Sequence, residues 1–267
     1  MKDADIVIFA SGISPSLEGE EMGVNLPGFK KGDRTDIELP AVQRELIDAL
    51  HRAGKKIILV NCSGSPIGLE PETQKCEAIL QAWYPGQQGG KAVAEVLFGD
   101  YNPAGKLPVT FYRNVSQLPD FEDYNMTGRT YRYMQDVPLF PFGYGLSYTT
   151  FGYGKTVLDK NELTAGQSLK LTVPVTNTGK RNGEEVVQVY LRKQGDAEGP
   201  IKTLRAFKRV SIPAGKTVNV EFDLKDKELE WWDDQSNTVR VCPGNYDIMV
   251  GGSSKEEDLQ RTTIAIK

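Results

Sequence analysis

Three carboxylates near the N-terminus have the type and spacing needed for proton-transfer chemistry. Glu18, Glu20 and Glu21 fall within four consecutive positions of a glycine-containing segment. Ionised carboxylates held this close repel one another, so the pKa of at least one is pushed upward, which suits a general acid. An acidic loop that only faces solvent is the alternative, and composition alone does not separate the two readings.

The elements expected to hold this segment belong to a parallel sheet. The continuous apolar run 6–10 predicts a strand covered on both faces, and 57–60 predicts a second one. Between them, Pro40 opens and Gly54 closes a helix whose apolar positions are Val42, Leu46, Ala49, Leu50 and Ala53. Strand, helix and strand form a right-handed crossover, and ligands bind beyond the carboxyl ends of such strands. The acidic segment follows the first strand, in a loop longer than the usual two to six residues.

The remainder of the chain divides into three stretches. Residues 79–83 predict a third strand, Gly89–Gly99 a helix, and 107–111 a further strand, so we expect an α/β sandwich domain over 1–113. Residues 114–152 are rich in Tyr, Phe, Pro and Gly and predict an extended linker packed against both neighbours. Strict alternation, as at Leu169, Leu171, Val173 and Val175, predicts an all-β fibronectin III- or immunoglobulin-like sandwich over 153–267.

Composition excludes several classes of function. With 32 basic and 36 acidic residues, the net charge of −4 gives the surface no general attraction for nucleic acid. No apolar run approaches the roughly 18 residues that would insert into a membrane, and the first five residues carry no recognisable targeting signal. The three cysteines are too scattered for a zinc site or a disulfide framework, although a Cys62–Cys76 bridge stays open.

Other candidate motifs favour ordinary structural roles. The chain has a single histidine, His51, and this excludes metal sites that need several histidines. His51 stands near a predicted helix C-terminus, where a cation is favourable. Residues 61–65 do not match the G-x-S-x-G turn of serine hydrolases, and 86–90 does not match a phosphate-binding loop. The pair Trp231–Trp232 is more typical of a sandwich core or edge than of a ligand site. We therefore expect no metal and no organic cofactor.

Several motifs, in the same order along nearly the whole chain, resemble glycoside hydrolase family 3. They are residues 12–20 with 33–40, Tyr84–Gly90, Phe98–Pro108 and the run Leu139–Phe151. The order Ser-Leu-Glu-Gly-Glu and then Asp-Arg is more similar to the β-xylosidase branch than to typical β-glucosidases. The resemblance implies part of a retaining exo-β-glycosidase, most like a β-xylosidase, acting on β-linked xylo-oligosaccharides or similar glycosides in the periplasm or outside the cell.

The resemblance also implies a partner. Family members begin with a (β/α)8 barrel that supplies the nucleophilic aspartate and most of the sugar pocket, and no segment of this chain could form it. A retaining glycosidase needs two carboxyl groups about 5–5.5 Å apart, and this chain offers one, so we expect the isolated chain to be inactive. β-Glucosidase activity and a non-catalytic carbohydrate-binding or structural module are the alternatives.

The resemblance assigns roles to residues of the acidic loop. Glu18 occupies the position of the general acid/base, while Glu20 and Glu21 remain alternates because residues 22–31 form an insertion relative to the family pattern. Asp33 and Arg34 are expected to anchor the loop through a salt bridge, against the alternative that both are simply solvated. The substrate-binding residues are not identified.

Overall fold

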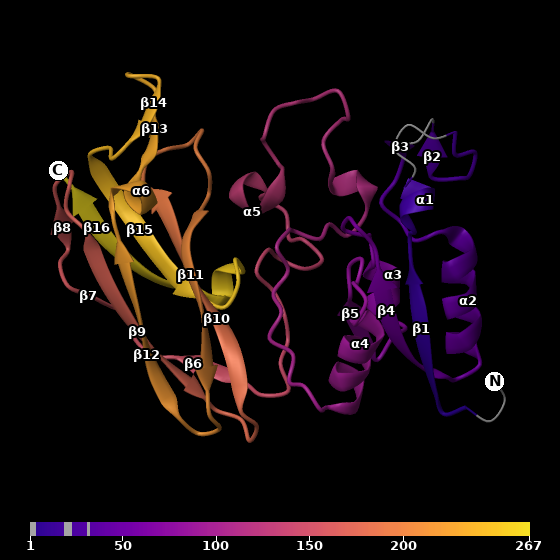
Figure 1. The fold of residues 1–267 in the computed structure, drawn as a ribbon. Coiled ribbons are helices and arrows are strands. Elements are labelled where there is room, and N and C mark those ends of the chain that lie inside the picture. Colours follow the sequence, from indigo (N-terminus) through magenta and orange to yellow (C-terminus); the bar gives the residue numbers. More distant parts are fainter. Residues whose placement is uncertain (1–3, 19–22, 31–32) are drawn as a thin grey trace. The chain divides into compact units, whose positions relative to one another are not determined.

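The computed structural model describes residues 4–18, 23–30 and 33–267, which form two compact units (Figure 1). The predicted α/β domain followed by an all-β sandwich is confirmed. Among the described residues, no helix is both long and apolar enough to cross a membrane.

The first unit contains a parallel sheet with strand order β1-β4-β5 (Figure 1). Its elements are β1 (Ile6–Gly12), α1 (Pro15–Glu18), β2 (Phe29–Lys30), β3 (Asp33–Arg34), α2 (Ala41–Arg52), β4 (Lys56–Cys62), α3 (Glu70–Thr73), β5 (Ala78–Gln81) and α4 (Gly89–Phe98). Three of the four strands predicted for this domain, and both predicted helices, are therefore present. Gly99 ends α4 in the left-handed conformation, at φ 83°, where glycine carries no Cβ penalty.

The core of the first unit lies between α2 and one face of this sheet. Val7 and Phe9 of β1 stand beside Ile57 and Leu59 of β4, and Ile47 of α2 packs into the same cluster. The opposite face is much more open, because Ile6 and Ile8 are 53% and 52% exposed. Parallel strands are normally covered on both faces, so this face is left open at the edge strand β1, whereas Val60 of β4 on the same face is buried.

The face through which α2 packs agrees with the predicted one only at Leu50. Ile47 and Leu50 are buried, whereas Val42 and Leu46 are 71% and 44% exposed. At 3.6 residues per turn, positions 42 and 46 lie well around the helix from position 47. Apolar residues therefore occupy more of the circumference than the sheet covers.

The second unit is a β-sandwich. One sheet has the order β11-β10-β15-β16-β8, and the other β12-β9-β6, with β7 pairing β9. A hairpin of β13 and β14 is attached. The bounds are α5 (Thr130–Tyr133), β6 (Phe151–Tyr153), β7 (Val157–Leu158), β8 (Glu162–Leu163), β9 (Leu169–Asn177), β10 (Gly183–Lys193), β11 (Thr203–Ile212), β12 (Thr217–Leu224), α6 (Asp226–Leu229), β13 (Trp231–Asp233), β14 (Thr238–Arg240), β15 (Gly244–Gly251) and β16 (Gln260–Ile266).

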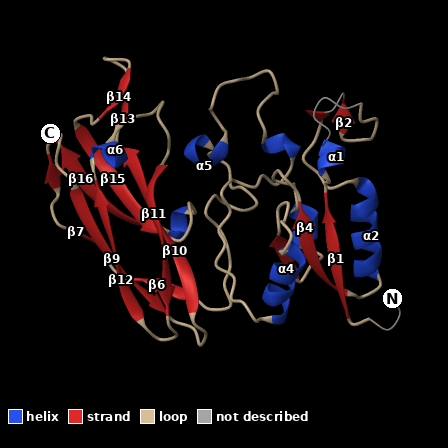
Figure 2. Cartoon of the chain, in the orientation of Figure 1, coloured by secondary structure: helices blue, strands red, loops and turns tan. Residues whose placement is uncertain are grey.

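Alternating side chains from both sheets make the core of this sandwich. Leu169, Leu171, Val173 and Val175 of β9 are all buried, as their period-two spacing predicts. Trp231 is buried in the same core, whereas Trp232 is 49% exposed. Figure 2 shows that this half of the chain is almost entirely strand and loop.

The predicted linker, residues 114–152, is divided between the two units. Residues 110–124 and 136–140 belong to the first unit, whereas 101–109, 125–135 and 141–267 belong to the second. The predicted strand at 107–111 is wrong. Leu107 bonds through its backbone to Tyr144, and Phe111 makes only an isolated bridge with Phe140. Residues 107–111 thus pair with the aromatic segment instead of forming a fourth strand of the parallel sheet.

All three cysteines are free thiols, so the Cys62–Cys76 bridge left open by the sequence is absent. Burial raises the pKa of Cys76 to about 11, and the charge of Glu72 acts in the same direction. Its thiol is therefore held in the protonated, unreactive form.

Candidate active site

The acidic loop begins at the carboxyl end of β1, where parallel sheets bind their ligands. The short helix α1 runs from Pro15 to Glu18, so Glu18 is the last residue of that turn. Its side chain lies outside what the structure describes, and Glu20 and Glu21 lie outside the described residues altogether. The arrangement thus gives the place of the backbone at Glu18 and leaves the choice among the three carboxylates as a prediction.

The entry to the loop is held by side chains from α2 and from the segment after β5. The Gln43 amide bonds both polar backbone groups of Gly12: its Oε1 accepts from the Gly12 N–H at 3.0 Å, and its Nε2 donates to the Gly12 carbonyl at 2.9 Å. One residue later, the Tyr84 hydroxyl donates to the Ile13 carbonyl at 2.8 Å. Ile13 itself is buried. The chain therefore leaves the sheet in a defined direction.

Gly12 occupies a position that only glycine fits. Its φ is +121°, and a Cβ at this position would lie 1.8 Å from the carbonyl oxygen of Cys62 in β4. Backbone approach this close is a reason for glycine at a strand end. The start of the loop is consequently packed directly against β4.

The exit of the loop is held by an ionic cluster around Arg44. This guanidinium donates to Glu38 Oε2 at 2.7 Å and to Glu72 Oε1 at 2.8 Å. It also reaches the carbonyl of Gly68 at 2.9 Å. Burial alone lowers the pKa of Arg44, but the hydrogen bonds and charges of Glu72 and Glu38 outweigh it, so the pKa is raised overall. The cluster joins the exit of the loop to α3.

The two predicted anchors differ in what they contact. Arg34 donates to the backbone carbonyl of Glu38 at 2.8 Å, and its guanidinium lies 3.7 Å from Asp36. It also stands over the Phe29 ring at 6.0 Å. Asp33 is exposed and pairs through its backbone with Lys30. Arg34 thus forms an ion pair with Asp36, and the anchoring role of Asp33 stays a prediction.

Nothing in the sequence indicated that Gln43, Arg44 and Tyr84 hold the acidic loop. Gln43 and Arg44 are polar residues in the first turn of α2, where they are indistinguishable from solvent-facing residues until the helix is placed on the sheet. Tyr84 lies among the motifs of the resemblance, but its hydroxyl partner is 71 residues away. The nearby Ser63 is fully buried and donates to the Ser65 carbonyl at 2.8 Å, so it is inaccessible as a nucleophile.

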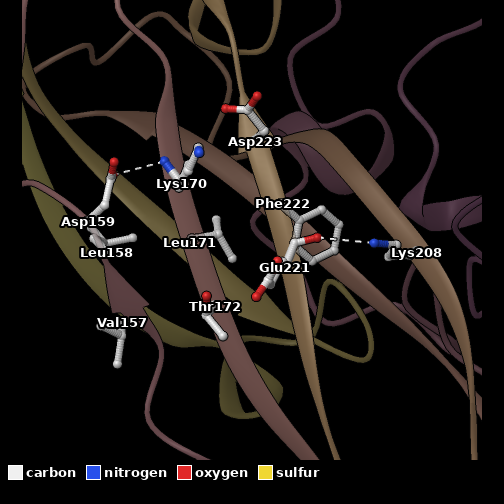
Figure 3. A pocket seen from close by; sticks show the side chains of 10 residues that line it. All are labelled: Val157, Leu158, Asp159, Lys170, Leu171, Thr172, Lys208, Glu221, Phe222 and Asp223. Atoms are coloured by element: carbon white, nitrogen blue, oxygen red, sulfur yellow. Dashed lines mark hydrogen bonds between the residues drawn. The ribbon is translucent and has the colours of Figure 1, made fainter.

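An open groove in the second unit contains none of the predicted site residues (Figure 3). It measures about 770 Å³ and is open over β9 and β12, with Lys170, Thr172, Lys208 and Glu221 among its lining residues. Lys208 donates to the Glu221 carbonyl at 3.3 Å. Within the described ranges, no three His, Cys, Asp or Glu side chains gather in a way that could hold a metal ion.

Comparison with known proteins identifies both parts of the chain. Residues 1–148 match the Glycosyl hydrolase family 3 C-terminal domain, and residues 185–254 match the Fibronectin type III-like domain. A xylan 1,4-beta-xylosidase of Xylanibacter ruminicola is 58% identical over the whole chain, which covers 30% of that protein. A periplasmic beta-glucosidase of Salmonella typhimurium is 37% identical over 95% of the chain, covering 33% of its length.

A solved structure has the same fold. The β-glucosidase EmGH1 of Erythrobacter marinus superposes with a TM-score of 0.84 at 39% identity, covering 100% of this chain and 35% of that one. The chain therefore spans about a third of the length of these relatives. From the matched domain and these relatives, the chain belongs to glycosyl hydrolase family 3.

Proposed function

We propose that this chain is the part of a retaining exo-β-glycosidase, a β-xylosidase, that supplies the general acid/base but not the nucleophile. The observation that carries the proposal is its 58% identity, over its whole length, with a xylan 1,4-beta-xylosidase. The substrate is then a β-linked xylo-oligosaccharide or a similar glycoside. The periplasmic relative supports a location in the periplasm or outside the cell.

In this proposal Glu18 acts twice. As a carboxylic acid it protonates the leaving oxygen while the nucleophile of the barrel attacks the anomeric carbon. As a carboxylate it then takes a proton from the water that hydrolyses the glycosyl-enzyme. The place of α1 at the carboxyl end of β1 supports this assignment, with Glu20 and Glu21 as alternates. The chemistry needs only carboxylates and water, so no cofactor is involved.

The uncovered apolar surfaces of the first unit support a partner within the same enzyme. Ile6 and Ile8 are exposed on one side of the edge strand β1, and Val42 and Leu46 form a second exposed patch on α2. Contiguous exposed apolar surface marks an interaction site, which favours part of a larger enzyme over an independent module. We assign the (β/α)8 barrel portion as that partner.

The test is complementation of a split enzyme. The barrel portion of the Xylanibacter relative, without the region that matches this chain, is expressed separately and mixed with the chain. We expect hydrolysis of 4-nitrophenyl β-xyloside by the mixture and by neither part alone. Activity of the chain alone would show that it contains both carboxylates. Inactivity of a folded mixture that binds tightly would favour a non-catalytic module.

β-Glucosidase is the second candidate, because the solved structure at a TM-score of 0.84 is one. Running the mixture on 4-nitrophenyl β-glucoside in parallel separates the two. A kcat/KM higher for the glucoside than for the xyloside would replace β-xylosidase by β-glucosidase and leave the assignment of the acid/base loop intact.

A further inference from the structure

We infer that two adjacent residues of α2, Gln43 and Arg44, form a clamp that positions the general acid/base by holding both ends of its loop. This inference rests on the proposed function, since it concerns the loop that carries Glu18. Gln43 bonds Gly12 at the entry, and Arg44 bonds Glu38 at the exit. Neither is a catalytic residue, because neither touches substrate.

The entry contact fixes direction as well as distance. A primary amide that donates to a carbonyl and accepts from the N–H of the same residue repeats the two-way pairing of an antiparallel ladder. Gly12 cannot shift toward β4, because the Cys62 carbonyl already occupies the space where a Cβ would lie. With Tyr84 holding the next carbonyl, the backbone is constrained only a few residues before Glu18.

The exit contact ties the far end of the loop to rigid structure. Glu38 forms an isolated bridge with Gly68, and the backbone N–H of Gly68 donates to the Ile37 carbonyl at 2.7 Å. Arg44 reaches Glu38, Gly68 and the fully buried Glu72 at once. The helix that carries both clamp residues is itself fixed on the sheet by Ile47 and Leu50.

The clamp matters because a general acid works only at hydrogen-bond distance from the leaving oxygen. A displacement of about 1 Å can cost roughly 100-fold in rate. Attaching both ends of the loop to neighbouring residues of one helix limits how far the backbone at Glu18, six residues after Gly12, can move relative to the sheet. The clamp therefore acts on the proton-transfer step, which is slow for poor leaving groups and nearly dispensable for activated ones.

The experiment uses the mixture of this chain with the barrel portion and compares Gln43→Leu, Gln43→Glu and wild type. We expect Gln43→Leu to lower kcat about 10- to 100-fold on alkyl β-xylosides and less than about 3-fold on 4-nitrophenyl β-xyloside. Gln43→Glu should show the same loss of kcat as Gln43→Leu at neutral pH. Its kcat should recover in acid, because a protonated carboxyl can again donate to the Gly12 carbonyl. Gln74→Leu, at an exposed glutamine of the same unit, is the matched control and should leave both rates unchanged.

A second measurement does not depend on catalysis. Amide hydrogen exchange of residues 12–18 in the mixture should speed up in Gln43→Leu and stay unchanged in Gln74→Leu. Unchanged exchange, or equal losses on both substrates, would overturn the clamp. Glu18→Gln, Glu20→Gln and Glu21→Gln run alongside, and if none shows a leaving-group effect, the acid/base proposal fails. If one does and Gln43→Leu does not, only the clamp fails.

Discussion

Glu72 has no exposed surface, and its carboxylate is tolerated because the guanidinium of Arg44 donates to both of its oxygens, at 2.8 and 3.1 Å. Removing one member of a buried ion pair leaves the other charge uncompensated. We predict that Arg44→Met lowers the free energy of unfolding by about 3 kcal/mol, measured by urea denaturation of the full chain. Lys91→Met breaks an exposed pair with Glu95 and should cost only about 0.5 kcal/mol. Similar losses for both variants would contradict the buried-pair argument.

Among the three loop carboxylates, the general acid is distinguished by its leaving-group signature. Glu18→Gln removes the proton donor, so we predict that kcat falls far more for alkyl β-xylosides than for 4-nitrophenyl β-xyloside in the assembled enzyme. Glu20→Gln and Glu21→Gln serve as matched controls and should leave the ratio of the two rates near that of wild type. The signature in a control variant instead would move the role to that residue.

At the scale of elements, the segment 101–109 is attached to the second unit through a buried charge. Lys106 lies 3.3 Å from Glu185 of β10, and Tyr153 of β6 donates to the same carboxylate at 3.1 Å. Burial raises the pKa of Glu185, and the charge and hydrogen bond of Lys106 and the hydrogen bond of Tyr153 oppose this only in part. Segment 101–109 is thus held to the sandwich by an ion pair with Glu185, whose protonation depends on pH.

This gives a pH prediction with a definite sign. Between the ordinary pKa of 4.5 and the raised one, the folded state binds more protons than the unfolded state, so stability falls as pH rises through that window. Glu185→Gln should remove this decline, because its amide has no proton to lose. The measurement is the free energy of unfolding of wild type and variant from pH 4 upward. A parallel decline in both would show that another group is responsible.

At the scale of the whole molecule, the exposed apolar side of the edge strand β1 predicts how the chain associates. Ile6→Thr with Ile8→Thr removes apolar surface that is already about half exposed, so we expect little change in Tm. Association with the barrel portion should weaken by roughly 2 kcal/mol, or about 30-fold in Kd, measured by calorimetry. Phe207→Ser, at a residue 68% exposed in the second unit, is the control and should leave Kd unchanged. Equal Kd values for all three proteins would place the interface elsewhere.

The sequence alone determined the parts governed by local periodicity. The apolar run of β1, the Pro-to-Gly limits of α2 and the alternation along β9 each correspond to the observed element. These patterns are readable because burial repeats every 3.6 residues in a helix and every two in a strand. The resemblance added the family, which agrees with the matched domains, while the role of the loop stays a prediction.

Tertiary structure alone decided which side chains meet. Gln43 bonds Gly12, 31 residues away, and Arg44 bonds Glu72, 28 residues away, so no local pattern reveals either of these two contacts. The same holds for 107–111, which pairs with the aromatic segment because distant backbone groups satisfy it there. The residue types indicated the proton-transfer chemistry, whereas the geometry that positions those residues depends on contacts between segments that only folding brings together.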